Sequence, residues 1–353
     1  MLRFWTSQND KYMDNKLKLI FVRENITKSV RKFFEREKFH EVETPVLNSS
    51  LPLEPNIHPF ATEWKRVKGE KKIYLSTSPE AGLKKMIAAG IGNCFSIGHS
   101  FRNLEDAGTL HNPEFLMLEW YREDADYKDI MENCERLVSY LFLKNKEQIT
   151  ENKKTSVKKD VNNRNILTYQ NRTISFRRPW QRITMTDLFG KYAGLDLDEI
   201  IDDEVLRRKA KEKGYDIKSA DWEQLFNQIF LNEIEPKLSP TPHFITDFPS
   251  RISPLCKPRK DKPYLAERFE FYLFGMELGN GNSENTDSQL IRSRMKEEMV
   301  YRSEKKIDFA PIDELFLAAL EKMKSKSWAG IGLGLDRLAM ILADTKNIKS
   351  LEI

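Results

Sequence analysis

The chain has 353 residues, enough for one large domain or two modest ones, and 40% of them are hydrophobic, so a sizeable core can form. The formal net charge of +4 and the charged fraction of 32% are ordinary for a soluble protein and too weak to indicate nucleic acid as a partner. There is no apolar secretory signal and no apolar run long enough for a transmembrane helix, so we expect a cytoplasmic protein with no membrane partner.

The 3 cysteines, Cys94, Cys134 and Cys256, are far apart in the sequence. None belongs to a CxxC pair or to a Cys/His cluster, so the pattern does not favour a zinc site. We expect reduced thiols.

The first predicted element is an amphipathic helix over residues 16–39, with apolar residues at helical spacing at Ile20, Ile26, Val30, Phe33 and Phe34. The sequence HEVETPVL follows and has the composition of a strand that contains Pro45. Because proline donates no hydrogen bond to a neighbouring strand, we expect this strand at a sheet edge or a subunit boundary.

The next elements alternate between strands and helices. IYLSTS at 73–78 predicts a strand, and 79–90 predicts a helix that begins at proline and ends at glycine. FSIGHSFRN and FLMLEWYRE predict two strands joined by a polar loop, and 126–143 predicts a helix.

A basic stretch separates the two halves of the chain. Residues 144–182 contain eleven Lys/Arg and three Asp/Glu, a net charge of +8 (11 − 3), and 145–170 lacks helical periodicity. We expect a mobile surface insertion at about 144–178. It is either a basic arm for an acidic partner or tRNA, or a solvated loop.

The second half returns to regular structure. Helices are predicted at 184–192, 203–214, 222–231 and 312–324, β-rich segments at 243–248 and 267–281, and a glycine-rich strand–helix junction at 329–342. Strands and helices are interleaved without a regular βαβ cadence. The pattern predicts an α+β domain built on a mostly antiparallel sheet flanked by helices.

Two segments carry groups suited to chemistry. Phe115, Met117, Glu119 and Tyr121 alternate along one predicted strand and so share one face, which suits a pocket that stacks a base and binds a cation. In FEFYLFGMEL, a hairpin loop centred on residues 273–274 would place Glu270 opposite Glu277. A magnesium ion between these carboxylates would remove their repulsion.

Several motifs together resemble the class II aminoacyl-tRNA synthetases, in the lysyl-tRNA synthetase branch. FFEREKFHEVETPVL is similar to motif 1, FRNLEDAGTLHNPEFLMLEWY to motif 2, LSTSPEAGLKKMIAAG to the amino-acid-binding loop, RFEFYLFGMELGNGNSENTD to the segment that supplies metal and side-chain ligands, and GIGLGLDRLAMIL to motif 3. HNPEFLMLEWYR is a near-literal match to the short paralogue that lysylates translation elongation factor P. The resemblance covers about 18–140 and 180–345.

The resemblance implies ATP-dependent, magnesium-dependent activation of lysine or β-lysine as the adenylate. It implies Arg102 as the bridge between substrate carboxylate and α-phosphate, and Arg337 as the γ-phosphate ligand, both as catalytic residues. The implied ATP-binding residues are Arg102, Asn103, Glu105, His111, Phe115, Glu270, Gly334 and Arg337. The implied amino-acid-binding residues are Ser78, Glu80, Glu119, Tyr121, Asn280, Glu284 and Gly332. The implied metal ligands are Glu270 and Glu277.

The sequence departs from the family pattern at some positions. The motif 2 loop is one residue longer, so Glu105 stands where the adenine-contacting glutamate is expected, and Thr109 and Leu110 replace the usual basic residue before the histidine. Asn282 replaces an apolar residue beside the substrate stem. Gly332 matches the lysyl-tRNA synthetases, whereas the paralogue tends to carry alanine, which favours α-lysine.

Three hypotheses for function follow. We expect one catalytic domain over 1–353, without the N-terminal anticodon-binding OB-fold of full lysyl-tRNA synthetases. That expectation favours elongation factor P as the acceptor, with a minimal enzyme that charges tRNA as the alternative. The third hypothesis is a non-catalytic paralogue that binds amino acid or ATP. Motif 1 implies a homodimer.

Overall fold

A computed structural model of the chain describes residues 15–104, 108–152, 165–218 and 220–351. Glu105, one of the predicted ATP-binding residues, lies outside this part of the chain.

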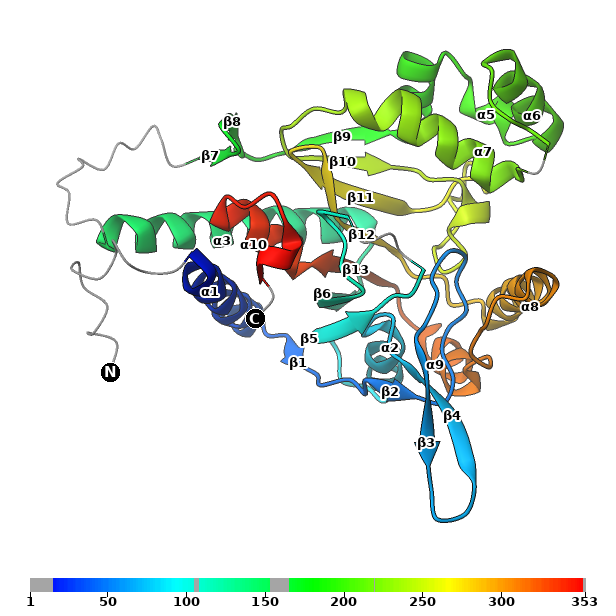
Figure 1. Cartoon of the computed structure of the whole chain (residues 1–353), viewed down its shortest axis with the longest axis horizontal. Coiled ribbons are helices and arrows are strands. Elements are labelled where there is room, and N and C mark those ends of the chain that lie inside the picture. The colour runs from blue at the N-terminus through cyan, green and yellow to red at the C-terminus, as the bar shows by residue number, and fades with distance from the viewer. Residues whose placement is uncertain (1–14, 105–107, 153–164, 219, 352–353) are drawn as a thin grey trace.

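The fold is built on one large sheet, which crosses the middle of the molecule (Figure 1). The order of its 8 strands is β1-β5-β6-β13-β12-β11-β10-β9. In that order the strands are His40–Glu41, Cys94–Phe101, Glu114–Glu123, Trp328–Gly334, Met276–Ser283, Arg268–Leu273, His243–Thr246 and Gln181–Thr184. The two outermost pairings, β1–β5 and β10–β9, are parallel, and the pairings between them are antiparallel. The predicted α+β class with a mostly antiparallel sheet is confirmed.

Helices cover both faces and one end of the sheet. They are α1 Asn15–Arg36, α2 Glu80–Ala88, α3 Tyr127–Asn152, α4 Met185–Leu188, α5 Leu197–Ile200, α6 Asp203–Glu212, α7 Trp222–Ile229, α8 Ser288–Lys305, α9 Glu314–Met323 and α10 Leu335–Ala343. Helices α1, α3 and α10 pack together on one side, and α4 to α7 stand over β9 and β10 (Figure 1). Helix α2 packs on β5, α9 packs on α2, and α8 packs on α9. The predicted helices are confirmed to within a few residues except α3, which ends at Asn152 instead of at residue 143, and α5 and α8 were not predicted.

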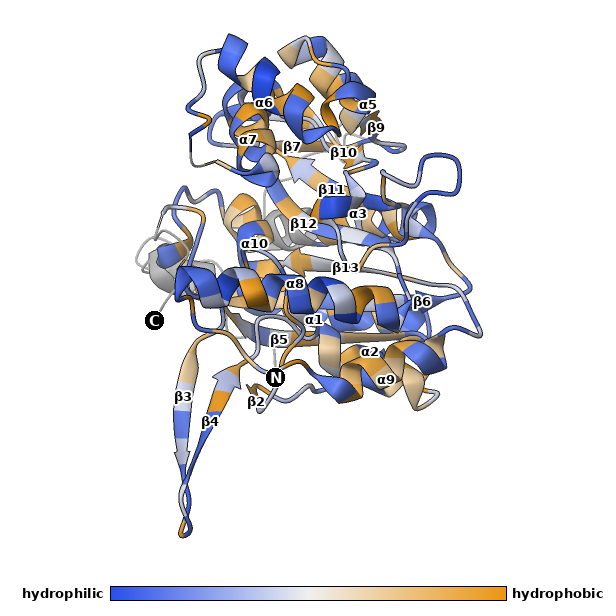
Figure 2. Cartoon of the chain, turned by 90° about the vertical axis from the view of Figure 1, so that its right-hand side faces the viewer, coloured by the Kyte–Doolittle hydropathy of each residue, from blue (hydrophilic) through white to orange (hydrophobic). Residues whose placement is uncertain are grey.

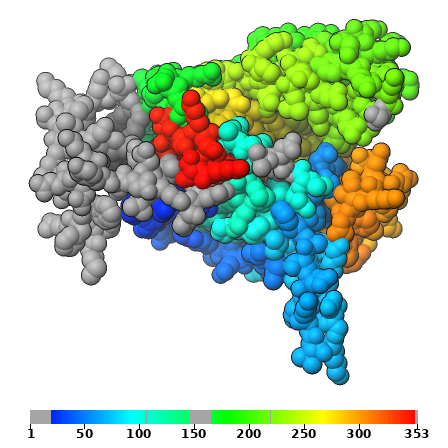
Figure 3. Space-filling model, in the orientation of Figure 1, coloured from blue at the N-terminus to red at the C-terminus, as the bar shows by residue number. Residues whose placement is uncertain are grey.

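Two small sheets stand apart from the large one. Strand β4, Glu70–Leu75, pairs with β2, Leu47–Asn48, and with β3, Ala61–Lys65. The β3–β4 hairpin projects from the body in every view (Figures 1, 2 and 3) and exposes Trp64 and Val67.

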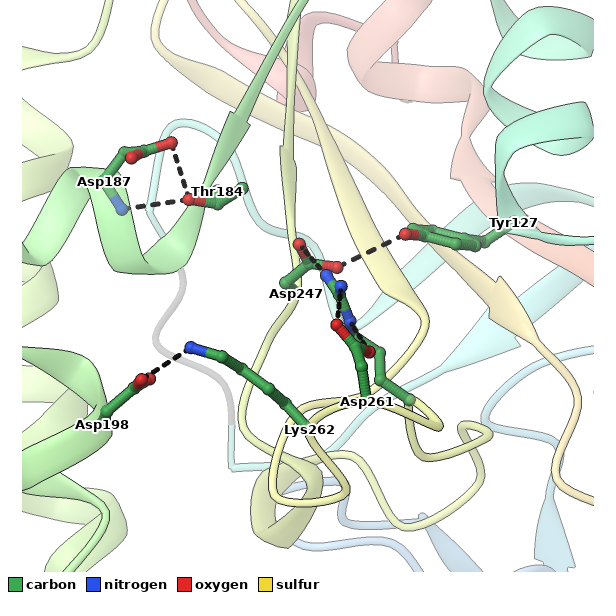
Figure 4. Close-up of polar contacts among 8 residues, drawn as sticks. Tyr127, Thr184, Asp187, Asp198, Asp247, Asp261 and Lys262 are labelled. Carbon is green, nitrogen blue, oxygen red and sulfur yellow. Dashed lines mark hydrogen bonds and ion pairs between the residues drawn. The ribbon is translucent and has the colours of Figure 1, made fainter.

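The helical unit α4–α7 is tied to the sheet by a polar cluster (Figure 4). Arg259 pairs with Asp247, at the end of β10, at 2.7 Å and with Asp261 at 2.7 Å. The Tyr127 hydroxyl at the start of α3 donates to Asp247 at 3.4 Å. Lys262, in the same loop, pairs with Asp198 of α5 at 2.6 Å. These contacts fix the loop 247–265, whose residues form one wall of the site described below.

Two predictions about local structure need correction. The region 145–170 was expected to lack a helix, but α3 continues to Asn152, and β7, Ile166–Tyr169, pairs with β8, Arg172–Ser175. The side chains of Leu167, Tyr169 and Ile174 are buried in the main core. Three apolar side chains among many polar ones anchor this hairpin. Their spacing is not helical, so the sequence pattern did not indicate regular structure here.

The strand expected around Pro45 is also different. Two short strands, β1 and β2, flank Pro45, which belongs to neither. Strand β1 is at the edge of the large sheet, as predicted, because β5 is its one neighbour among the strands of the described residues. No helix in the described ranges is long and apolar enough to cross a membrane.

Candidate active site

The β5–β6 pair forms the floor of the site. On β6, Leu116, Leu118 and Trp120 point into the main core. The alternate residues Phe115, Met117, Glu119 and Tyr121 point the other way and line cavities on the opposite face. The predicted sharing of one face is confirmed, and it follows from the two-residue period of a strand.

Two adjoining cavities open on this face. One, of about 400 Å³, contains Ser78, Glu80, Glu119 and Tyr121 in its wall. The other, of about 270 Å³, is lined by His111, Phe115, Gly334 and Arg337. Five residues line both: Arg102, Met117, Glu277, Asn280 and Gly332. The predicted amino-acid and nucleotide residues therefore separate into two neighbouring spaces, and Arg102 lies where they meet.

Arg102 follows directly after β5 and is held in place from two sides. Its guanidinium lies over the ring of Phe115, 5.3 Å from the ring centre, and its Nε donates to the Thr77 carbonyl at 3.4 Å. Contact with an aromatic face orients the planar group without neutralising it. The oriented side chain lies in the wall of both cavities.

Arg337 lies in the first turn of α10. Its Nη1 donates to the Glu277 carbonyl at 2.7 Å, and its Nε donates to the Leu110 carbonyl at 3.2 Å. Both acceptors are neutral, so the positive charge stays available at the edge of the smaller cavity. The altered motif 2 loop thus still contributes a backbone carbonyl that orients this arginine.

Glycines of β12 and β13 create the space. A Cβ on Gly330 would lie 2.5 Å from the Tyr121 ring, and one on Gly281 would lie 2.6 Å from the Gly330 carbonyl oxygen. A Cβ on Gly332 would meet the Met117 Sδ at 3.5 Å, an ordinary contact. Gly330 and Gly281 are therefore required by packing, whereas Gly332 leaves open room next to Met117 and Glu119.

Buried acidic groups dominate the larger cavity. The Tyr121 hydroxyl donates to Glu119 at 2.5 Å. Burial and the nearby Glu80 carboxylate raise the pKa of Glu119 well above its ordinary value, although the Tyr121 hydrogen bond opposes the shift. A cationic ligand stabilises the ionised form of such a carboxyl group, because the ligand takes the place of the proton.

Lys84 was missed by the sequence interpretation. It is buried, its ammonium lies 2.5 Å from Glu284 Oε2, and it also pairs with Glu80. Burial would lower the pKa of Lys84, but Glu284 and Glu80 outweigh it and raise the pKa above the usual range. Glu284 lies behind this ammonium, outside the residues that line the cavity. Its pKa is raised to about 7 by burial, against the effect of Lys84.

Asn282, which replaces an apolar residue of the family pattern, belongs to the same network. Its side-chain amide donates to Glu284 at 3.1 Å and to the Ser283 carbonyl at 3.0 Å. On the other side of the cavity, Ser78 Oγ accepts the Glu80 backbone N–H at 3.3 Å and so fixes the start of α2. These contacts orient the acidic groups.

The predicted face-to-face arrangement of Glu270 and Glu277 is wrong. Phe274 and Gly275 form the turn, both with positive φ, and a register shift follows between Phe271 and Tyr272. Glu270 consequently lies opposite Asn280, and Glu277 opposite Tyr272. The sequence interpretation had centred the loop one residue too early.

Glu270 and Glu277 nevertheless line the same cavity. Burial and then Glu277 raise the pKa of Glu270 to about 7, while Arg268 and Tyr272 donate to its two oxygens at 2.9 and 3.1 Å. Within the described ranges, no group of three or more His, Cys, Asp or Glu side chains could hold a metal by itself. A magnesium ion here would therefore need further oxygen ligands.

Asn103 does not match its predicted role. It lies outside the lining of both cavities, and its side-chain oxygen accepts the Leu104 backbone N–H at 2.9 Å. The structure instead adds Glu54 and Arg268, which line the larger cavity and were not predicted. The sequence around Glu54 has no helical or strand period. The proline and asparagine that follow Glu54 indicate a turn, but not a site.

Comparison with known proteins defines the class. The chain matches the family of class II tRNA synthetases (D, K and N) over residues 5–352, and it belongs to this family. A lysine–tRNA ligase of Nostoc sp. is 35% identical over 331 residues, which are 93% of this chain and 55% of that protein. A lysine–tRNA ligase of Carboxydothermus hydrogenoformans is 32% identical over 350 residues, 99% of this chain and 67% of that protein. The chain thus spans about half the length of the first of these relatives.

Proposed function

We propose that the protein uses ATP to activate lysine or a lysine isomer as an aminoacyl-adenylate and then transfers it to an amine acceptor. The observation that carries this proposal is the pair of adjoining cavities that share Arg102, one acidic and one with an aromatic and a cationic wall. An amino acid in the first and a nucleotide in the second would meet at that arginine.

The reaction brings two anions together, the substrate carboxylate and the α-phosphate. Arg102 would bind one oxygen of each and stabilise the charge that develops as the carboxylate attacks phosphorus. Phe115 would stack on adenine, His111 would close over the phosphates, and Arg337 would hold the γ-phosphate. Pyrophosphate leaves, and the mixed anhydride remains in the larger cavity.

The acidic cavity accounts for selection of a diamine substrate. Glu80 would bind the amine next to the substrate carboxylate, and Glu119 with Tyr121 the side-chain amine. Asn280, which lines both cavities, would contact the substrate between them. Glu284 would act through Lys84 and Asn282, which contact it directly. A neutral amino acid would leave Glu119 without a cationic partner, which is unfavourable.

The carboxylates of Glu270 and Glu277 suit magnesium, since hard cations prefer oxygen ligands. Glu277 raises the pKa of Glu270, so a cation between the two would be favourable. The phosphates of ATP and water would complete the ligand set. When bound, magnesium would neutralise phosphate charge as pyrophosphate departs.

Two acceptors are considered. The near-literal match of HNPEFLMLEWYR to the paralogue that lysylates elongation factor P favours a lysine of that protein. The similarity to lysine–tRNA ligases favours tRNA. We take the protein acceptor as the first hypothesis, and charging of tRNA as the second.

We also propose that the protein acts as a homodimer. Val46 and Leu47, beside Pro45, are large apolar side chains that are 40% and 56% exposed. Their position in the motif 1 segment, next to edge strand β1, is suited to contact with a second copy. Light scattering after size exclusion tests this, and a monomer at micromolar concentration would contradict it.

Incubation with ATP, radiolabelled lysine, total tRNA and purified elongation factor P tests the function and the acceptor together. We expect AMP formation and label on elongation factor P. Label on tRNA alone would support the second hypothesis. Absence of AMP and label with both lysine and β-lysine would support a non-catalytic paralogue that only binds amino acid or ATP, and would overturn the proposal.

A further inference from the structure

The loop 53–58 connects the projecting hairpin region to the active site and rises toward the α7 side of the sheet (Figure 1). Arg302 of α8, which is fully buried, donates to the Glu54 carbonyl at 2.6 Å and to the Ile57 carbonyl at 3.0 Å. The His58 carbonyl accepts the Asn103 backbone N–H at 2.7 Å. The loop is therefore fixed beside Arg102.

The Glu54 side chain belongs to the wall of the active site. Its carboxyl faces the larger cavity, and burial, followed by the nearby Glu80, raises its pKa to about 7. Arg102, Lys84 and Arg268 act in the opposite direction, which places Glu54 within electrostatic reach of the arginine that binds the reacting groups. In the part of the chain that is described, this carboxylate forms no hydrogen bond or ion pair. It remains available to a ligand.

The cavity next to Glu54 extends beyond the predicted amino-acid site. Asn56 donates to Glu223 of α7 at 2.6 Å, and the wall continues with Phe226 and Ile252. Burial, then Asp221, raises the pKa of Glu223 as well. This part of the cavity is apolar and acidic, which suits an ammonium on an alkyl stem.

The same lining is unfavourable to the end of an RNA. Among described residues of the larger cavity the cations are Arg102 and Arg268. Arg268 is paired with Glu270 at 2.9 Å, and Arg102 is reserved for the carboxylate and α-phosphate. An RNA terminus would bring further phosphates past Glu54 and Glu223 with no additional cation to meet them, whereas binding of nucleic acid depends on such contacts.

We propose, on the basis of the proposed function, that this part of the cavity receives the side-chain ammonium of an acceptor lysine and that Glu54 is its proton acceptor. The ammonium transfers one proton to the Glu54 carboxylate and becomes a nucleophilic amine. Its nitrogen attacks the adenylate carbonyl carbon, so a C–N bond forms. The bond from that carbon to the phosphate oxygen breaks, and its electron pair leaves with AMP. The nitrogen loses its second proton to water, and an amide remains.

Glu54→Gln tests the assignment, because it keeps the shape and removes the basic group. Pre-formed enzyme–adenylate is mixed in single turnover with either Nα-acetyl-lysine methylamide, an ammonium at neutral pH, or hydroxylamine, which is already a neutral nucleophile. We expect the variant to slow transfer to the lysine derivative by about 100-fold or more, and capture by hydroxylamine far less. The rise of the wild-type rate with pH through about 7 should also flatten in the variant.

Matched variants complete the test. Glu54→Asp should restore part of the rate, and Glu63→Gln, on the exposed β3–β4 hairpin, should leave both reactions unchanged. Equal slowing with both nucleophiles, or no slowing, would overturn the proposal. A large rise in the KM for lysine when Glu54→Gln is assayed by pyrophosphate exchange would also overturn the proposal, because it would place Glu54 on the activated amino acid. Transfer of lysine to tRNA at a rate unaffected by Glu54→Gln would overturn it as well. If the wild type forms no adenylate, the proposed function itself fails, which is a separate result.

Discussion

Lys84 is the buried cation on which the acidic cavity depends, and its removal should be severely destabilising. The side chains of Lys84 and Glu284 are each 1% exposed, and the ammonium also pairs with Glu80. Lys84→Met keeps the length of the side chain and removes the charge. The two carboxylates then face each other in a site from which water is largely excluded.

The expected loss in the free energy of unfolding is about 3–5 kcal/mol at pH 7.5, the range for breaking one partner of a buried ion pair. An exposed pair provides the matched control. Lys72 and Asp308 are 2.6 Å apart, but their side chains are 50% and 59% exposed, so Lys72→Met should cost about 1 kcal/mol or less. The difference in stability loss between the two variants depends on the burial of the ion pair more than on its N–O distance.

Urea denaturation monitored by tryptophan fluorescence gives both values. Adding Glu284→Gln to Lys84→Met should recover about 2 kcal/mol, since the second change removes the uncompensated charge. The loss caused by Lys84→Met should also shrink at pH 6, where Glu284, with a pKa of about 7, takes up a proton. Equal losses for the two lysine variants, or no recovery in the double variant, would refute this account of the network.

The remaining predictions concern the glycines, the catalytic arginine and pH. Gly330→Ala should lower the free energy of unfolding by about 1–3 kcal/mol, because its Cβ would lie 2.5 Å from the Tyr121 ring. Gly332→Ala should fold normally and lower the affinity for lysine measured by calorimetry. Similar stabilities of the two variants would contradict this. Arg102→Ala should reduce pyrophosphate exchange by about 100-fold or more while the protein stays folded, and an active variant would disprove its role. Carboxyl pKa values raised from 4.5 to about 7 mean that the empty protein binds more protons than the unfolded chain in that window, so its stability falls as pH rises. Lysine requires the ionised form of Glu119, whose pKa is also raised by burial and by Glu80, so the stabilising effect of lysine on the melting temperature should grow as pH rises, and a pH-independent shift would argue against this.

The parts of the site that lie on regular strands could be predicted from the sequence. The alternation along β6 requires Phe115, Met117, Glu119 and Tyr121 to share a face, and the structure lines both cavities with them. The sheet class followed in the same way from the spacing of strands and helices. Local periodicity was sufficient for these features.

The parts that depend on contacts distant in the chain could not be predicted. Lys84 and Lys85 are adjacent on α2, yet Lys84 is fully buried against Glu284, whereas Lys85 is 31% exposed and pairs with Asp313. No pattern in the helix distinguishes them. The hairpin loop was placed one residue too early because Phe274, a large residue, adopts a positive φ there, and the register shift between Phe271 and Tyr272 displaced the pairing of Glu270 further.

The basic region shows a further limit of composition. Its high content of lysine and asparagine favoured a mobile loop, but residues 166–175 form a hairpin whose apolar side chains reach the core. A few buried apolar residues determine the structure of this segment, and its average composition does not reveal them.

The central claim, activation of a diamine amino acid by ATP, is tested most directly by amino-acid-dependent exchange of pyrophosphate into ATP. Lysine should be compared with norleucine, which has a side chain of similar length and no side-chain ammonium. We predict exchange with lysine or β-lysine and at least about 1,000-fold less with norleucine, since the buried Glu119 carboxylate would lack a cationic partner. Equal exchange with norleucine, or none with either lysine isomer, would contradict the account.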